Sequence, residues 1–288
     1  MAGALSRSGP MMRKLLPLIF PLFALSACTP VGTTQVDRDL THSIEAGGLT
    51  GDKLAAGYVD RGTLRLLNDD IDDGIADYDA AIGAAPGYAA AYTWRGQALD
   101  AKGDDRRAID DFDHAVTLDP QAWQAYGARG LLLARTGQPD HALSDLGRAI
   151  ELGAGHEKEF LIQHTSITPI QVFNPKGPSE STKARAEFTL RADYYLSFLR
   201  TIRGGLLLER GRYDDALVDL NEATRLNPQS PRARWNYGLV QLAIGRCAEG
   251  VAELRAANAL TYGTEPAYMS TERNRAFVAK TPCSDVLR

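Results

Sequence analysis

The sequence predicts an all-α protein, an α-solenoid of stacked helix pairs, because one pattern recurs at a fixed spacing. Glycines mark the same point of each unit and stand 34 residues apart within two groups: Gly62, Gly96 and Gly130, then Gly204 and Gly238. An Ala follows each glycine after nineteen residues, and Pro86, Pro120 and Pro228 close three of the units. Such a period is the signature of helical hairpins that are each too small to bury their own apolar face.

The unit that ends at Pro120 shows how the pattern encodes two helices. Small and apolar residues share one face from residue 87 to residue 101, which predicts a first amphipathic helix. Asp104 is a suitable N-cap for a second helix. We expect that helix to end at Leu118, because a proline disfavours helix in the residue before it.

The glycine in the middle of each first helix has a cost of about 1 kcal/mol relative to Ala. Close approach of two helix backbones would offset this cost. We therefore expect Ala108, Ala142 or Ala216, on the second helices, to face these glycines.

These units resemble the tetratricopeptide repeat (TPR), a 34-residue helix–turn–helix with small residues at the Gly and Ala positions and Pro at its end. The resemblance covers three repeats in residues 53–154 and two in residues 196–262. It implies a right-handed superhelix of about five repeats. It does not specify a ligand, since one fold serves many functions.

The N-terminus reads as a lipoprotein signal peptide over residues 1–27. Arg13 and Lys14 precede a 13-residue apolar run, residues 15–27, which is too short to span a bilayer. The run ends in a sequence that resembles the lipobox of bacterial lipoproteins, and this resemblance implies that Cys28 is lipidated. Thr29 in place of Asp implies the outer membrane, with the chain facing the periplasm. The alternative is an ordinary signal peptide, or a buried helix, with a chance Cys.

Three segments depart from the repeat pattern. Residues 28–52 are polar and rich in Gly and Thr, which predicts a flexible tether. Residues 155–195 contain three prolines, and we interpret them as a long loop leading into a helix that begins near Ser181 and ends near Glu209. A disordered spacer is the alternative there. Residues 263–288 are expected to form a capping helix, over about residues 266–280, and a tail.

An Arg precedes four of the five glycines, and an Asp lies sixteen residues after each Arg. This repeated identity predicts an Arg–Asp ladder along the stack, with the pairs Arg61–Asp77, Arg95–Asp111, Arg129–Asp145 and Arg203–Asp219. In the fifth repeat Tyr237 replaces the Arg and Glu253 replaces the Asp. Ligand binding by these arginines is the alternative interpretation.

Two further cysteines remain once Cys28 is assigned to the anchor. An even remainder in an exported protein predicts one disulfide, Cys247–Cys283, which would tie the C-terminal tail to the last repeat. Two unpaired thiols are the alternative.

The inner face of the first helices is where TPR units usually hold their ligands. Residues three before, one after and four after each glycine share this face. The candidates for a partner-binding groove are Thr93, Gln97, Asp100, Leu131, Trp235, Leu239 and Leu242. Their mostly uncharged character suits an amphipathic helix or an apolar segment. Alternatively, the insertion, the terminal helix or a second copy fills this groove.

Composition excludes several function classes. A net charge of −4 without a basic run argues against nucleic acid as a partner. His156 and Glu157 begin like a zinc-helix motif, but Phe160 stands where the second His would be. No nucleophile or phosphate-loop motif is present. We expect no enzyme, no cofactor and no metal.

The layout of anchor, tether and repeats resembles the lipoprotein adaptors that recruit murein hydrolases and a processing protease. The resemblance implies an outer-membrane scaffold for periplasmic or other envelope proteins, and a homodimer is compatible with it. The alternative is an assembly factor resembling the TPR pilotins, which escort pilus secretin subunits.

Overall fold

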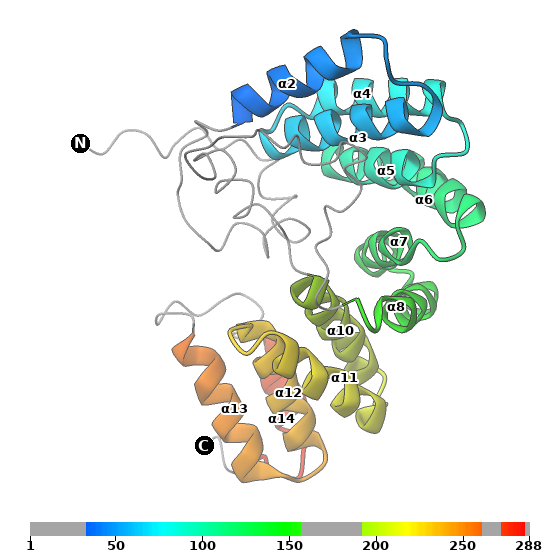
Figure 1. Cartoon of the computed structure of the whole chain (residues 1–288). Helices are drawn as coiled ribbons and strands as arrows, with labels where there is room; N and C mark the ends of the chain where they lie inside the picture. Colours follow the sequence, from blue (N-terminus) through cyan, green and yellow to red (C-terminus); the bar gives the residue numbers. More distant parts are fainter. Residues whose placement is uncertain (1–32, 157–191, 261–271, 286–288) are drawn as a thin grey trace. The chain divides into compact units, whose positions relative to one another are not determined.

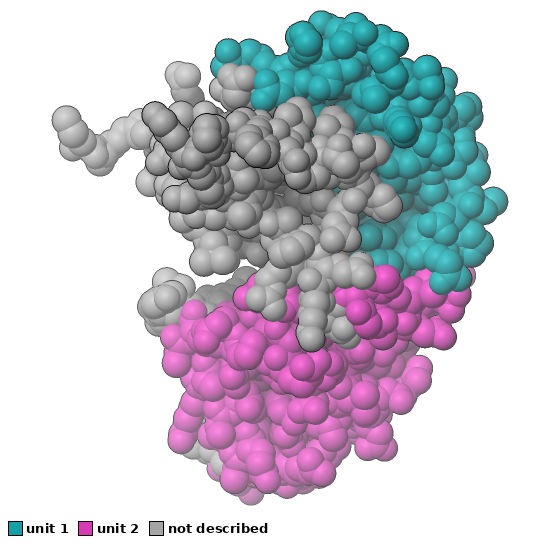
Figure 2. Space-filling view, viewed as in Figure 1, with its two compact units in different colours: residues 1–132, 159–191 teal, residues 133–158, 192–288 magenta. Residues whose placement is uncertain are grey.

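The structure is a computed structural model that describes residues 33–156, 192–260 and 272–285 (Figure 1). These residues form twelve helices and no strand, so the predicted all-α repeat fold is confirmed. The described residues fall into two compact units (Figure 2). Unit 1 contains described residues 33–132, and unit 2 contains residues 133–156 and the described residues from 192 onward.

Unit 1 is built of helix pairs. Its helices are α2 (Thr33–Glu45), α3 (Gly51–Leu67), α4 (Ile71–Ala84), α5 (Ala89–Lys102), α6 (Asp105–Leu118) and the greater part of α7 (Trp123–Arg135). α3 pairs with α4, and α5 pairs with α6. α5 also packs on both α4 and α3, so each pair stacks on the one before it.

Unit 2 repeats this arrangement. Its helices after α7 are α8 (Pro139–Gly153), α10 (Ala192–Glu209), α11 (Tyr213–Leu226), α12 (Pro231–Ala243), α13 (Cys247–Ala259) and α14 (Glu272–Val278). α10 packs directly on α8, although 38 residues (154–191) separate them in the sequence. The helix stack therefore continues across the predicted insertion as it does between ordinary neighbours.

The helix ends follow the local signals in the sequence. The pair α5–α6 spans residues 89–102 and 105–118, within two residues of the expected bounds. Gly103 adopts a φ of +84°, a left-handed conformation that suits a glycine between two helices. The Asp104 carboxylate accepts a hydrogen bond from the backbone N–H of Arg107 at 3.3 Å, as an N-cap does.

The predicted tether over residues 28–52 is wrong for its central part, where α2 is a helix packed on α3. Ile44 is buried and lies 3.3 Å from the Cβ position of Gly57. The Thr41 hydroxyl accepts from Arg61 Nη1 at 3.2 Å. Leu40 and Ile44, four residues apart, were the weak helical signal within a polar composition.

The two other irregular segments are described only in part. The helix expected from Ser181 to Glu209 ends at Glu209, and its described part begins at Ala192; residues 181–191 lie outside the described residues. The expected capping helix over residues 266–280 is present as α14, whose described helix covers residues 272–278. None of the described helices combines the length and apolar character that crossing a bilayer requires.

The repeated glycines allow close helix contact, and in the repeats that contain Ala108 and Ala216 the nearest atoms belong to a larger side chain. A Cβ on Gly96 would lie 2.7 Å from the ring of Phe112. A Cβ on Gly204 would lie 2.6 Å from Cγ of Leu220. These large side chains stand sixteen residues after each glycine, whereas the predicted alanines stand twelve after and are buried beside them. The glycine thus makes room for one large core side chain from the second helix.

Candidate functional site

The predicted Arg–Asp pairs are the most regular polar feature of the described residues. The guanidinium groups donate from Nη2 to Oδ1 of the partner at 2.6 Å in Arg61–Asp77, 2.7 Å in Arg95–Asp111 and 2.6 Å in Arg203–Asp219. In each pair Nε also donates to the same carboxylate, so the contact is bidentate. All three aspartates are buried. Each pair joins the first and second helix of one repeat.

The first three arginines each have a second acceptor on a preceding helix. Arg95 Nη1 donates to Asp79 of α4 at 2.7 Å, and Arg129 Nη1 donates to Asp113 of α6 at 2.6 Å. Arg61 belongs to the first repeat and uses the Thr41 hydroxyl of α2 instead. One guanidinium therefore links two successive repeats, which the sequence analysis did not predict. The carboxylates recur sixteen residues before the arginines, and this spacing was the available signal.

An aromatic ring accompanies the first three arginines. Tyr58, Tyr92 and Tyr126 stand three residues before them, and the guanidinium carbons lie 5.5, 5.6 and 5.5 Å from the ring centroids. These are cation–π distances. The guanidinium groups are thus held by a ring as well as by hydrogen-bond acceptors.

The hydrogen bonds raise the pKa of the arginines. The pKa of Arg95 is raised chiefly by its hydrogen bond to Asp111, and that of Arg61 by its bond to Asp77. Burial opposes both shifts. The two guanidinium groups therefore stay charged while they hold their aspartates.

The fifth repeat departs from the predicted pairing. Glu253 accepts from Arg234 Nη1 at 2.9 Å. Tyr237 and Glu253 stand at the positions of the Arg and the Asp, but the arginine that pairs with Glu253 stands one helical turn earlier, at the place of the usual tyrosine. In the fourth repeat Arg200 occupies that same place and donates to Asp219 at 3.2 Å.

The fourth predicted pair, Arg129 with Asp145, joins residues of different units and stays a prediction. Unit 2 lacks the second carboxylate acceptor at the corresponding position of α8. Gly147 stands two residues after Asp145, where α4 has Asp79 and α6 has Asp113. Its Cβ position lies 3.2 Å from Arg203 Nη1, so the arginine of α10 approaches the backbone of α8 there.

The seven predicted groove residues do not share one environment. Leu239 and Leu242 belong to the apolar core that α12 forms with α11, α13 and Cys283, so their assignment to a partner-binding groove is wrong. Leu242, four residues after Gly238, lies 2.7 Å from the Cβ position of Gly250 and so faces the second helix of its own repeat. Sequence spacing alone could not separate this face from the neighbouring one.

Among the other five, three are buried and two are partly exposed. Thr93, Asp100 and Leu131 are buried, and the Thr93 hydroxyl donates to the Ala89 carbonyl of its own helix at 3.1 Å. Gln97 and Trp235 remain partly exposed. The alternative that residues 157–191 cover this face lies outside the described residues. Gln97 and Trp235 are therefore the predicted groove residues best placed to touch a partner.

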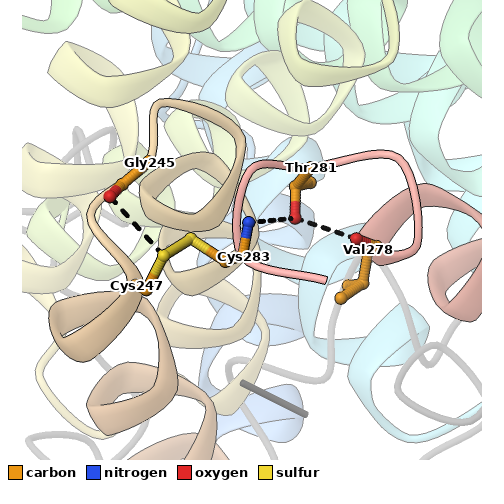
Figure 3. Close-up of a disulfide and its surroundings, with 5 residues drawn as sticks. All are labelled: Gly245, Cys247, Val278, Thr281 and Cys283. Atoms are coloured by element: carbon orange, nitrogen blue, oxygen red, sulfur yellow. Dashed lines mark hydrogen bonds between the residues drawn. A yellow bond between two sulfur atoms is a disulfide. The ribbon is translucent and has the colours of Figure 1, made fainter. Parts of the chain in front are cut away.

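A disulfide joins Cys247, at the start of α13, to Cys283 after α14 (Figure 3). The two Cα atoms are 5.4 Å apart. Cys283 is buried, and its backbone N–H donates to the Thr281 hydroxyl at 3.3 Å. Phe277 and Val278 of α14 pack on the same core, so the bond ties this helix over the last repeat. Cys28 lies outside the described residues.

The acidic side chains described next are dispersed or paired with guanidinium groups. No group of three or more His, Cys, Asp or Glu side chains gathers as a metal site in the described part of the chain. The buried carboxylates of Asp77, Asp111 and Asp219 are each engaged by a guanidinium, so they are not available as general bases.

Comparison with known proteins agrees with the repeat architecture. Residues 59–122 and 101–157 match the family described as tetratricopeptide repeat, and residues 204–245 match one described as TPR repeat. No curated protein sequence matches this chain.

Two of the solved structures with a similar fold are YrrB and PilW. YrrB, a TPR protein with an unusual peptide-binding site, is 20% identical with a TM-score of 0.52, over 79% of this chain and 95% of that one. PilW, a type IV pilus biogenesis factor, is 12% identical with a TM-score of 0.51, over 81% of this chain and 88% of that one. Identities this low establish only the fold. Together with the matched segments, they show that this chain is built of tetratricopeptide repeats, in residues 59–157 and 204–245.

Proposed function

We propose that this protein is a scaffold, anchored by lipid to the outer membrane and facing the periplasm, that binds other envelope proteins through its first helices. The observation that carries the binding role is the way these helices lie together. α3 packs on α5 in unit 1, and α10 packs on α12 in unit 2. Within each unit, side chains at one register of successive repeats are thereby brought to one face, as an extended partner requires.

The rigidity of each unit supports a docking role. Arg95 bonds to two successive second helices, so neighbouring repeats are held in register by charge-assisted bonds as well as by packing. A pre-ordered face loses less conformational entropy on binding than a mobile one. Repeat arrays of this kind are typically non-catalytic, which agrees with the engaged carboxylates described above.

The anchor rests on the N-terminal sequence. The resemblance of the segment before Cys28 to a lipobox supports export and lipidation. Two acyl chains are enough for stable membrane attachment. The intramolecular disulfide between Cys247 and Cys283 is consistent with an oxidising compartment such as the periplasm.

Murein hydrolases or a processing protease are the partners we propose first, by resemblance to lipoprotein adaptors with the same layout. The peptide-binding site named for YrrB favours a peptide segment of such a partner as the docked element. A pilotin-like role with an outer-membrane secretin is the second candidate, which the similarity to the pilus factor PilW favours.

Site-specific photocrosslinking in cells tests the binding face. A photoreactive residue at Gln97 or Trp235 should capture an envelope protein. The same residue at His114 of α6 or Val218 of α11, both exposed on second helices, should not. Capture of hydrolases or a protease supports the first candidate, and capture of a secretin supports the second. Equal capture at all four positions, or crosslinks only between copies of this chain, would refute the proposed partner face.

The anchor is tested separately with Cys28→Ser. This variant should leave the membrane fraction and be recovered in soluble periplasm, while the unmodified chain stays with the outer membrane. Retention of the variant in the membrane would contradict lipid attachment at Cys28.

A further inference from the structure

The helix α2 changes the expected relation between the repeats and the membrane, because it occupies the stretch that the sequence predicted to be a tether. We propose that the anchor holds unit 1 close to the lipid surface, with the turn between α3 and α4 on the membrane side. This inference rests on the proposed lipidation of Cys28.

Three contacts fix α2 on α3. Asp37 Oδ1 lies 3.6 Å from Arg65 Nε, and the Thr41 hydroxyl lies 3.2 Å from Arg61 Nη1. In the third contact, Ile44 Cγ1 lies 3.3 Å from the Cβ position of Gly57.

The contacts also give the direction of α2. Asp37 on α2 contacts Arg65 on α3, and Thr41, later on α2, contacts the earlier residue Arg61 on α3. The two helices therefore run antiparallel, as Figure 1 also shows. The first residue of α2, Thr33, therefore lies at the edge of unit 1 where α3 ends and the turn Asn68–Asp70 leads into α4.

The covalent distance from the anchor to this edge is short. Five Cα-to-Cα steps separate Cys28 from Thr33, and a fully extended chain covers at most about 18 Å in that number of steps. A tether that reached Asp52 could have spanned about 80 Å by the same rule. The packed helix removes most of this reach, so unit 1 cannot stand far from the lipid.

The opposite edge of unit 1 lies one helix length from the edge at Thr33. α4 runs from Ile71 to Ala84, and its 14 residues rise by about 20 Å in total. The turn that contains Gly87 follows α4 and is therefore at the edge away from Thr33. The proposal thus predicts a difference in depth between two turns of the same unit.

Charge at the near edge shows that attachment there depends on the anchor. Asp69, Asp70, Asp72 and Asp73 are all exposed at the α3–α4 turn, and Lys102 is bonded to Asp72. An acidic turn is repelled by anionic lipid headgroups rather than attracted. The turn therefore lies near the membrane because the chain is short, and a partner that docks on unit 1 must present its docking segment close to the lipid surface.

Fluorescence quenching in vesicles tests this placement with the lipidated full-length protein. A single label is attached through Asp73→Cys at the near edge or through Gly87→Cys at the far edge. Both positions are exposed, and no atom lies within 4 Å of the Cβ position of Gly87. Cys247 and Cys283 are bonded to each other, so neither competes for the label. The vesicles are phosphatidylcholine with a short-range quencher on the headgroup.

The expected result is stronger quenching at residue 73 than at residue 87. A flexible Gly/Ser insertion of about 30 residues between Gly32 and Thr33 restores a long tether, so it should weaken quenching and remove the difference. Vesicle flotation of each sample reports the anchor independently. A chain that floats but shows equal or reversed quenching overturns this inference and leaves the anchor intact. A chain that does not float refutes the anchor, and this inference with it.

Discussion

Arg234 of α12 donates from Nη1 to Oε2 of Glu253 on α13 at 2.9 Å, across nineteen residues of sequence. The corresponding pair in an earlier repeat, Arg95 with Asp111, spans sixteen. Residues three apart share a helix face, so a guanidinium can move from one position to the other and still face the second helix. Glu is one methylene longer than Asp, which helps it to reach the earlier turn. The fifth repeat therefore keeps the ion pair with its Tyr and Arg exchanged.

This exchange predicts that the order of the two residues can be reversed. Arg234→Ala should lower the free energy of unfolding by about 1 kcal/mol, because the pair is partly exposed. The double variant Arg234→Tyr with Tyr237→Arg restores the order of the first three repeats and should recover most of that loss. Chemical denaturation measures both. A double variant no more stable than Arg234→Ala would show that the position of the arginine is specific.

The two acceptors of Arg95 should differ in their contribution to stability. Asp111 has a side-chain exposure of 7% and Asp79 of 54%. Asp111→Asn weakens a buried charge pair and should cost about 2–3 kcal/mol, whereas Asp79→Asn should cost less than about 1 kcal/mol. Denaturant midpoints of the two variants give the comparison, and equal losses would contradict the importance of burial here.

Two glycines in neighbouring helices should respond in opposite directions to the same change. Gly96→Ala places a methyl group against the Phe112 ring, with only 2.7 Å between the added Cβ and Cε1 of the ring, and should destabilise by about 1–3 kcal/mol. Gly83 lies near the end of α4 with no atom within 4 Å of its Cβ position. Gly83→Ala should therefore stabilise by about 0.5–1 kcal/mol. Thermal or denaturant unfolding measures the stability change of each variant. Two stability changes of the same sign would contradict the close approach at Gly96.

Alkaline pH should destabilise unit 1 partly through Tyr78. Burial raises the pKa of Tyr78 well above its ordinary value of 10.0, while its hydroxyl donates to Thr63 Oγ1 at 3.3 Å. In the unfolded chain the Tyr78 hydroxyl ionises near pH 10. Its contribution to the free energy of unfolding is therefore complete below that pH and is lost as the pH rises above it. Tyr78→Phe cannot ionise and should lose less stability between about pH 9 and about pH 11. Urea midpoints at the two pH values measure this. An unchanged pH dependence would exclude a contribution from Tyr78.

The disulfide should stabilise the end of unit 2 and leave unit 1 unaffected. The sequence separation of 36 residues corresponds to about 3–4 kcal/mol in the chain-entropy model. In the double variant Cys247→Ser and Cys283→Ser, we expect faster amide hydrogen exchange in α12 and α13 and no change in α5. A reducing agent should reproduce this effect in the unmodified chain and have none on the variant. Faster exchange throughout both units would show that the bond has a wider role.

The candidate site was predictable where it repeats and not where it departs from the repeat. Arg95 with Asp111 could be paired because the same two residue types recur at the same spacing in other units. Arg234 with Glu253 was missed, although Arg200 and Asp219 in the fourth repeat have the same spacing of nineteen residues. Leu242 was placed on the partner face because helical spacing defines directions around one helix, but it does not say which direction a neighbouring helix covers.

By itself, the sequence determined the all-α class, the period of the helix pairs and the aspartate partners of Arg61, Arg95 and Arg203. These follow from patterns within about 35 residues, the length of one helical hairpin. Only the tertiary structure decided that α2 packs on α3, that α10 stacks on α8, and that the Arg95 guanidinium also reaches the preceding repeat. Those contacts join different hairpins, and their free energy comes from surfaces that no single segment contains.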